Sequence, residues 1–223
     1  MRLPSLLRRT PFRLTLLFLA LFVAAAGAIL AYVYFASASE AQGRAQAEVE
    51  AERAALTAVY RTRGLDALNQ ALVERAIRVD HAGEYGAKRI YEGQLAALRW
   101  TGRGRGEASR KIAAMAQAEH KHNKEFDRLL VARRVRPTLL SPLWSVAGFA
   151  LGAATALMGE KAAMACTVAV EETIDEHYAG QAAALGDDEA ELRGTIEKFR
   201  AEEIEHKDVA LAAGAEQATA YGP

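Results

Sequence analysis

The sequence of 223 residues has one cysteine, five prolines and few aromatic residues (7%). A single cysteine excludes a scaffold of intrachain disulfides, and Cys166, within the apolar run MACTVAV, is interpreted as a small buried side chain. Twenty-eight basic residues balance twenty-eight acidic ones, and no basic cluster occurs after residue 13. Because the electrostatic signature of a nucleic-acid-binding surface is missing, we expect no nucleic acid partner.

Alternation of apolar and polar residues, which would predict strands, is almost absent after Gly64, where apolar residues recur at helical spacing. We therefore expect an all-α domain over residues 65–223. Its helices are predicted at 65–100, 107–135, 160–185 and from the GDD break at 186–188 to about 214. A further segment, 141–158, is apolar on all sides and is expected either to cross between helix pairs as a buried helix or to enter a membrane.

The longest uncharged run is at the N-terminal end, over residues 14–39. It exceeds the ~20 residues that a helix needs to cross a bilayer, and it is too long for the apolar part of a signal peptide. A transmembrane anchor is therefore favoured over a cleaved signal, although the residues 36–38 (ASA) could serve as a cleavage site. A basic segment, 1–13, precedes the span, and 40–64 is predicted as a polar helical spacer.

Two histidines each follow a glutamate by three residues, so each Glu-x-x-His pair shares one helix face. Either pair alone would be typical of a solvated helix. However, the helix before each pair carries a further glutamate among apolar residues. The two halves of the domain therefore repeat the same order, in which a helix with one glutamate is followed by a helix with a Glu-x-x-His pair. The candidate metal ligands are Glu84, Glu119, His122, Glu203, His206 and either Glu171 or Glu172.

Four carboxylates and two imidazoles inside a four-helix bundle are the ligand set of the ferritin-like di-iron proteins. Anionic oxygen ligands suit iron, and carboxylates can hold two ions close together. Structural zinc sites favour cysteine and histidine sets, which this sequence does not offer. The pattern therefore predicts a ferritin-like four-helix bundle that binds two iron ions.

Three segments resemble signatures of the demethoxyubiquinone hydroxylase family, the di-iron monooxygenases of ubiquinone biosynthesis. They are RVDHAGEYGAKRIYEGQ, RVRPTLLSPLWSVAGFALGAATALMGEKAAMACTVAVEE and KFRAEEIEHKD. The similarity extends over about residues 76–221. It implies a membrane-bound enzyme that hydroxylates the ring of a long-tailed demethoxyubiquinol with O2, and it selects Glu171 as the ligand.

The resemblance also implies that NADH supplies electrons to the iron through the quinone itself. In agreement, the sequence has no G-x-G-x-x-G nucleotide fingerprint. Because an isoprenoid tail partitions into lipid, we expect the protein on a bacterial or mitochondrial inner membrane, with 141–158 as an apolar entrance for the substrate. An accessory lipid-binding protein of the pathway is a further implied partner.

Several other polar residues lie close to the predicted ligands in the sequence. Two of them precede the first single glutamate by about one helical turn and could orient ligands, and two match family positions beside the site, where they could contact substrate or pass protons. These four candidates are Asp80, His81, His177 and Tyr178. Three glutamates off the ligand stripe are expected to face solvent: Glu172, Glu202 and Glu205.

Two features depart from the family. The sequence ends at AEQATAYGP, where members continue into a further apolar and basic helix that helps membrane and substrate contact, and typical members lack the span at 14–39. Four arginines before the span, against Arg44 and Arg53 after it, favour an inside N-terminus and thus an outside domain. An enzyme that draws on NADH should instead face the cytoplasm or matrix, so the two arguments conflict.

Two other functions are compatible with the same residues. A ferroxidase or peroxidase that stores iron or removes peroxide uses similar ligands on the same bundle, although it needs neither an anchor nor an apolar crossover. A membrane-tethered quinone-binding protein without catalytic activity would instead purify without iron. Metal content and quinone turnover separate these functions from a hydroxylase.

Overall fold

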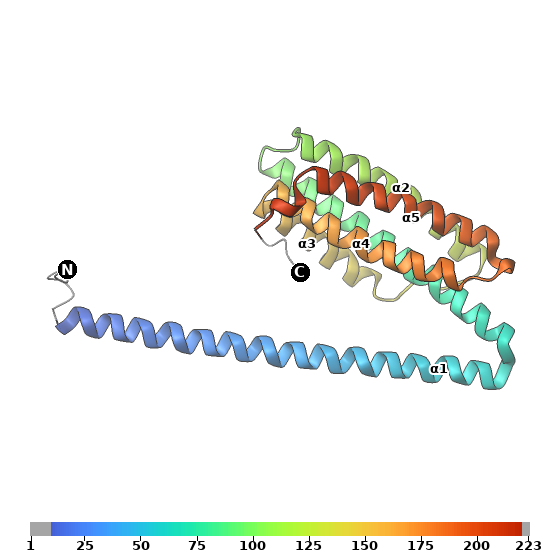
Figure 1. The fold of residues 1–223 in the computed structure, drawn as a ribbon, viewed down its shortest axis with the longest axis horizontal. Coiled ribbons are helices and arrows are strands. Elements are labelled where there is room, and N and C mark those ends of the chain that lie inside the picture. Colours follow the sequence, from blue (N-terminus) through green and yellow to red (C-terminus); the bar gives the residue numbers. More distant parts are fainter. Residues whose placement is uncertain (1–9, 220–223) are drawn as a thin grey trace. The chain divides into compact units, whose positions relative to one another are not determined.

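The computed structural model describes residues 10–219, and in that range the chain forms helices and no strand (Figure 1). This confirms the expected all-α fold class. The chain divides into two compact units, one up to Leu68 and one from Asn69 onward. Helix α1 (Thr10–Trp100) passes through both, with non-helical backbone at Gly64 (φ 85°, ψ −173°). Only glycine adopts this positive φ readily, because it has no Cβ atom.

The described part of the first unit is α1 up to Leu68, which includes the break at Gly64. Its backbone is helical over both the predicted span, 14–39, and the predicted spacer, 40–64, up to Gly64. Exposed ion pairs one helical turn apart join Arg44 to Glu40 and Arg53 to Glu50, as expected for a solvated helix. Most of the basic segment 1–13 lies outside the described residues. Membrane insertion of 14–39 stays a prediction.

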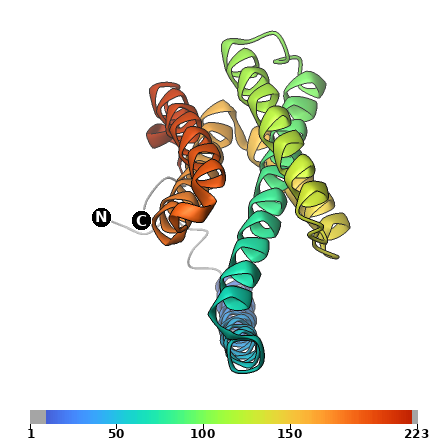
Figure 2. The same cartoon turned by 90° about the vertical axis from the view of Figure 1, so that its right-hand side faces the viewer.

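The second unit is a bundle of helices. After α1 come α2 (Glu107–Ala132), α3 (Ser141–Met158), α4 (Glu160–Ala184) and α5 (Ala190–Ala212), with short 3-10 helices η2 (Asp187–Glu189) and η3 (Ala215–Gln217). The end of α1 runs beside α2, and α4 runs beside α5 (Figures 1 and 2). Helix α2 ends three residues before the predicted limit, because the chain turns through Arg134 (φ 55°) before Pro137.

Two apolar clusters form the core of the bundle. The first contains residues near the C-terminal end of α1 and the N-terminal end of α2, such as Leu98 and Ile112. The second contains Ile77 of α1 and Phe126 of α2, toward the other ends of these two helices, and Ile196 in the first half of α5. On α1, α2, α4 and α5, the predicted metal ligands lie in sequence between residues of the first cluster and residues of the second. The fold therefore encloses these polar side chains between two apolar layers.

Helix α3 packs on the bundle through small residues. A Cβ atom at Gly152 would collide with the carbonyl oxygen of Ile90 in α1, and one at Gly93 in α1 would collide with the carbonyl oxygen of Phe149 in α3. The backbones of α1 and α3 therefore approach more closely than any larger residue would permit. This contact fixes α3 against the part of α1 that follows Glu84 by about two turns.

The opposite face of α3 is apolar and exposed. Only Gly152 and Ala156 of this helix are buried, whereas Val146 is 70% exposed and Met158 70% exposed. The alternative of a buried crossover is therefore wrong for most of the helix, because its packing surface is a narrow row of small residues. By length and composition, α3 is long and apolar enough to cross a membrane.

From the close approach of α1 and α3 we predict how substitution of Gly152 changes the stability of the protein. Gly152→Ala should lower the free energy of unfolding by about 1–3 kcal/mol, because the added methyl group meets backbone that cannot rotate away. The control Gly194→Ala, at an exposed position of α5 with open space, should raise it by about 0.5–1 kcal/mol. Denaturant unfolding of the full chain in detergent, followed by circular dichroism, measures both. Equal effects of the two substitutions would contradict the packing described here.

Candidate metal centre

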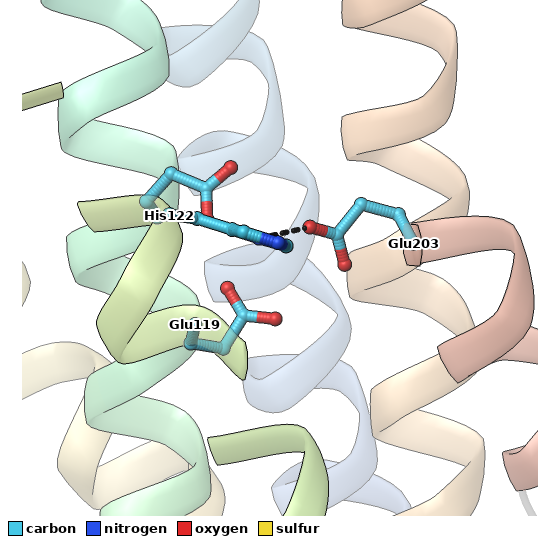
Figure 3. Close-up of side chains that lie close together, drawn as sticks. Glu119, His122 and Glu203 are labelled. Atoms are coloured by element: carbon cyan, nitrogen blue, oxygen red, sulfur yellow. Dashed lines mark ion pairs between the residues drawn. The ribbon is translucent and has the colours of Figure 1, made fainter. Parts of the chain in front are cut away.

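Six buried side chains from four helices converge at the middle of the bundle. The helix α1 contributes one, α2 two, α4 one and α5 two: Glu84, Glu119, His122, Glu171, Glu203 and His206. These are the six predicted ligands, and the structure brings all of them together. Figure 3 shows Glu119 and His122 of α2 pointing toward Glu203 of α5.

The six residues form two overlapping groups whose potential ligand atoms lie within 4.8 Å of one another. One group consists of Glu84, Glu119, His122 and Glu203, and the other of Glu119, Glu171, Glu203 and His206. Glu119 and Glu203 belong to both groups. The arrangement thus offers two neighbouring positions for metal ions, with two shared carboxylates between them.

Both histidines direct Nδ1 into the cluster. His122 Nδ1 lies 2.8 Å from Glu203 Oε1 and 3.4 Å from Glu84 Oε2. His206 Nδ1 lies 2.9 Å from Glu203 Oε2 and 3.3 Å from Glu119 Oε1. Since one helical turn separates each histidine from its partner glutamate, the Glu-x-x-His spacing alone brings both side chains to one point.

Several potential ligand atoms of the cluster have no hydrogen-bond partner. They are Glu84 Oε2, both carboxylate oxygens of Glu119 and Glu171 Oε2. Unpaired polar atoms are rare in protein interiors, and a buried carboxylate without a partner is strongly unfavourable. Divalent cations would satisfy these atoms, and the oxygen-rich set with one imidazole per position fits iron in particular.

Burial dominates the protonation of two carboxylates. It raises the pKa of Glu119 well above its usual range, and repulsion from Glu84, Glu203 and Glu171 raises it further. Burial likewise raises the pKa of Glu171, and repulsion from Glu203 adds to this effect. Without metal, the cluster therefore favours protonated carboxyl groups, because four negative charges cannot be held so close together in a buried site.

The ion pair between Glu203 and the histidines has the opposite effect. Although burial acts against the charged form of both partners, hydrogen bonds from His122 and His206 lower the pKa of Glu203 to about 2. Burial lowers the pKa of His122, but hydrogen bonds to Glu203 and Glu84 outweigh this and raise it to about 10. In the metal-free cluster, positive imidazolium thus occupies the place that a metal ion would take.

Two buried tyrosines connect the two halves of the cluster. Tyr91 of α1 donates a hydrogen bond to Glu171 of α4, and Tyr178 of α4 donates one to Glu84 of α1. Each tyrosine follows its own helix's glutamate by seven residues, so it lies two turns along the same face. The hydroxyl groups therefore hold the two single glutamates in place across the bundle.

Tyr91 was not among the predicted site residues, although the sequence contains a signal for it. The segments EYGAKRIYEGQ and EETIDEHYAGQ share the pattern E-x6-Y-x-G-Q, so the repeat of the two halves extends beyond the ligands. The glutamine that ends the pattern in each half also forms a hydrogen bond between α1 and α4. Gln94 Nε2 donates to the carbonyl oxygen of Ala163 (3.0 Å), and Gln181 Nε2 donates to Asp80 Oδ1 (2.5 Å).

The other candidate residues differ in their surroundings. Asp80 is buried beside Gln181, and burial raises its pKa to about 8 despite that hydrogen bond. His81 is buried, and its Nε2 lies 3.0 Å from Asp127 Oδ1 of α2. His177 is not brought to the cluster as expected, because it is exposed and its Nδ1–H donates to the carbonyl oxygen of Thr173 in its own helix.

The expectation that Glu202 faces solvent is wrong. Its side chain is only 36% exposed, and Oε2 lies 2.8 Å from His122 Nε2, the ring nitrogen that points away from the cluster. The position next to a ligand on a helix is turned away from the ligand stripe, but a side chain as long as glutamate can reach back to the neighbouring helix. Glu172 and Glu205 are exposed as predicted.

An apolar groove opens beside the cluster, with a volume of about 1450 Å³. Helices α1, α3 and α4 supply its walls, and its lining includes Ala87, Ile90, Leu151 and Ala165. Residues next to two ligands in the sequence also line it, since Gly83 precedes Glu84 and both neighbours of Glu171 take part. The groove therefore runs from α3 along the parts of α1 and α4 that carry Glu84 and Glu171, although neither glutamate lines it.

This fold and site define an all-helical protein with a buried carboxylate and imidazole cluster that could hold metal ions. Residues 71–223 match the family model described as ubiquinone biosynthesis protein COQ7. The chain belongs to this family, which confirms the resemblance of its sequence motifs to the demethoxyubiquinone hydroxylases.

Several curated relatives are similar over most of their length. The 3-demethoxyubiquinol 3-hydroxylase of Rhodospirillum rubrum is 57% identical over 152 residues, which cover 68% of this chain and 69% of the relative. The human NADPH-dependent 3-demethoxyubiquinone 3-hydroxylase, mitochondrial, is 52% identical over 168 residues (73% and 75%). The 5-demethoxyubiquinone hydroxylase, mitochondrial, of Saccharomyces cerevisiae is 39% identical over 168 residues (68% and 70%).

The protonation of the cluster predicts that metal binding releases protons. Ligation requires ionised carboxylates and neutral imidazoles, whereas burial and repulsion favour protonated Glu119 and Glu171, and the raised pKa keeps His122 charged. Affinity for Fe²⁺ should therefore fall continuously as the pH is lowered from about 10, the pKa of His122. Anaerobic calorimetry of the metal-free protein in buffers of different ionisation enthalpy measures the protons released. An enthalpy independent of the buffer would contradict the assigned protonation states.

Proposed function

We propose that this chain hydroxylates the ring of a demethoxyubiquinol with O2, as an iron-dependent monooxygenase of ubiquinone biosynthesis. The observation that carries the proposal is the convergence of six buried ligand-type side chains with unsatisfied atoms beside an apolar groove. The printed names of the relatives, which are hydroxylases of demethoxyubiquinone or demethoxyubiquinol, supply the substrate class.

The proposed centre is of the ferritin-like type, with two iron ions held by the six residues. Glu84 and His122 would hold one ion and Glu171 and His206 the other, with Glu119 and Glu203 shared. Bound iron would supply the capacity to activate O2 for insertion of one oxygen atom into the substrate ring. Four carboxylates against two Fe²⁺ ions sum to zero charge, which suits a site between apolar layers.

The chain's own residues would hold this centre rigid and dry. Tyr91 and Tyr178 donate to the two glutamates that are not shared, so their carboxylates are fixed in orientation. Phe199 stacks on the ring of His122, with centroids 4.1 Å apart, and fixes the imidazole plane. The two apolar clusters on either side limit water access, so reactive oxygen would be directed to the substrate in the groove.

The groove is the proposed site of the long-tailed quinone. Its lining is predominantly apolar, which suits an isoprenoid tail, and it passes residues adjacent in sequence to Glu84 and Glu171. The ring would thus lie beside the metal centre while the tail extends toward α3. Leu143, Val146 and Met158 on the exposed face of α3 would rest in the lipid, so the tail would not have to leave the bilayer.

The membrane attachment would have two parts, namely the apolar face of α3 and a transmembrane anchor at 14–39. Together they would hold the protein on a bacterial or mitochondrial inner membrane, where its quinone substrate would be dissolved. Relatives of both origins support this location, since the Rhodospirillum rubrum protein is bacterial and the human one is named mitochondrial. An accessory lipid-binding protein that presents the substrate is part of the proposal.

The electron donor in the proposal is a reduced nicotinamide, which would pass electrons to the iron through the quinone without a dedicated nucleotide domain. The sequence resemblance implies NADH, whereas the human relative is named NADPH-dependent. Turnover should therefore be compared with both donors at equal concentration. A rate that requires a separate reductase protein would contradict direct reduction through the quinone.

The proposed function is tested with the full chain in detergent, loaded anaerobically with Fe²⁺ and then supplied with a short-tailed demethoxyquinone, reduced nicotinamide and ¹⁸O2. We expect two iron ions per chain and a hydroxylated quinone that carries one ¹⁸O atom, seen by mass spectrometry. Glu119→Ala and His206→Ala should abolish iron retention and turnover, since each removes a ligand. The control Glu172→Ala, at an exposed position beside a ligand, should keep full iron content.

Other outcomes of this experiment would contradict the hydroxylase. Oxidation of Fe²⁺ by O2 or peroxide without quinone consumption would indicate a ferroxidase or peroxidase on the same cluster. A protein that binds quinone but retains no iron would indicate a tethered quinone-binding protein. Full turnover by a metal-free His206→Ala variant would exclude the assigned ligands.

A further inference from the structure

The repeated halves of the bundle place equivalent residues around the two metal positions, but one position has an additional charged contact. This inference rests on the proposed metal centre and concerns the difference between its two halves. The equivalent pairs Glu119-x-x-His122 and Glu203-x-x-His206 are joined to the cluster in the same way, through Nδ1. The charged contacts of the two histidines differ at their other ring nitrogen, Nε2.

At His122 that nitrogen has a carboxylate partner. Glu202 Oε2 accepts a hydrogen bond from Nε2–H at 2.8 Å, from the residue directly before the ligand Glu203. The other carboxylate oxygen of Glu202 lies 3.9 Å from Lys198 Nζ, one turn earlier on α5. Because Lys198 is 70% exposed, solvent screens this second contact and leaves most of the carboxylate charge directed at the imidazole.

At His206 the equivalent contact is absent among the described residues. By the repeat, the residue that corresponds to Glu202 is the one before Glu119, which is Ala118 and has no polar group. Every carboxylate of the described chain within 4.0 Å of His206 lies on the Nδ1 side, inside the cluster. The two imidazoles are therefore supported differently, although their first contacts are alike.

Asp80 makes no comparable contact on the His122 side. It corresponds by the repeat to Thr167, so it is a second place where the halves differ, and it lies one turn before Glu84. However, Asp80 accepts a hydrogen bond from Gln181, and within the described chain it forms no hydrogen bond or ion pair with a ligand histidine. The carboxylate that contacts a ligand histidine on its outer nitrogen is thus that of Glu202.

We propose that Glu202 is a positioning residue that makes the two metal positions inequivalent, with the first divalent ion bound at the His122 position. A carboxylate on Nε2–H fixes the tautomer that leaves the Nδ1 lone pair facing the cluster, and it makes the imidazole a stronger donor. The ion held by Glu84 and His122 then binds before the ion held by Glu171 and His206. The stacking of Phe199 on His122 has no aromatic equivalent at His206, where the repeat places Met115.

The test is an anaerobic titration of the metal-free full chain with Co²⁺, followed by calorimetry and by the visible bands of bound Co²⁺. We expect two resolved steps in the wild type. Glu202→Gln keeps the size of the side chain but removes its charge, and it should weaken the tighter step by about 10–100-fold while the weaker step changes less than about twofold. Glu205→Gln, an exposed loss of the same charge on the same helix, should change neither step.

Variants of the histidines identify the positions. His122→Ala should remove the tighter step and its visible bands, and His206→Ala the weaker one. Two equal steps in the wild type, equal weakening of both steps by Glu202→Gln, or loss of the tighter step in His206→Ala would each overturn the inference while leaving the metal centre intact. Failure of the wild type to bind any Co²⁺ would instead overturn the metal centre itself.

Discussion

Four carboxylates enclosed between two apolar layers are the constraint on which this structure depends. Like charges at such short range are strongly unfavourable in a protein interior, and the metal-free chain relieves this by protonating Glu119 and Glu171 and by pairing Glu203 with imidazolium. Apolar packing on both sides holds the helices together despite this repulsion. The bundle is thus suited to receive cations, because bound divalent ions would replace the protons and neutralise the carboxylates.

The repeat of the two halves explains why these residues meet. Each half supplies a helix with E-x6-Y-x-G-Q and a helix with Glu-x-x-His, and the tyrosine of each half bonds to the glutamate of the other. This exchange ties α1 to α4 at the level of the cluster. The halves differ at many positions, and Glu202 against Ala118 is the difference that places a carboxylate on the outer ring nitrogen of one ligand histidine. Because the repeated helix pairs are alike but only His122 contacts a carboxylate on its outer nitrogen, two metal ions bound in this cluster would have different surroundings.

Much of this could be predicted from the sequence, since helical periodicity and the Glu-x-x-His spacing are local properties of the chain. The bounds of α3 and the break at Gly64 were predicted closely, whereas the end of α2 depends on the unusual backbone of Arg134. Tyr91 could have been found by extending the repeat. The contact of Glu202 could not, because a residue beside the ligand stripe looks solvated until the neighbouring helix is placed. The exposure of α3 likewise depends on packing through Gly152, which hydropathy does not report.

The central claim is that the six residues hold two iron ions, with Glu119 and Glu203 shared between them. The most direct measurement is anomalous X-ray diffraction at the iron absorption edge from crystals of the Fe²⁺-loaded protein. The account predicts two peaks inside the cluster, one near His122 Nδ1 and one near His206 Nδ1, with the two shared carboxylates between them. A single peak, a peak outside the cluster, or iron-loaded crystals without an anomalous peak at these side chains would contradict it.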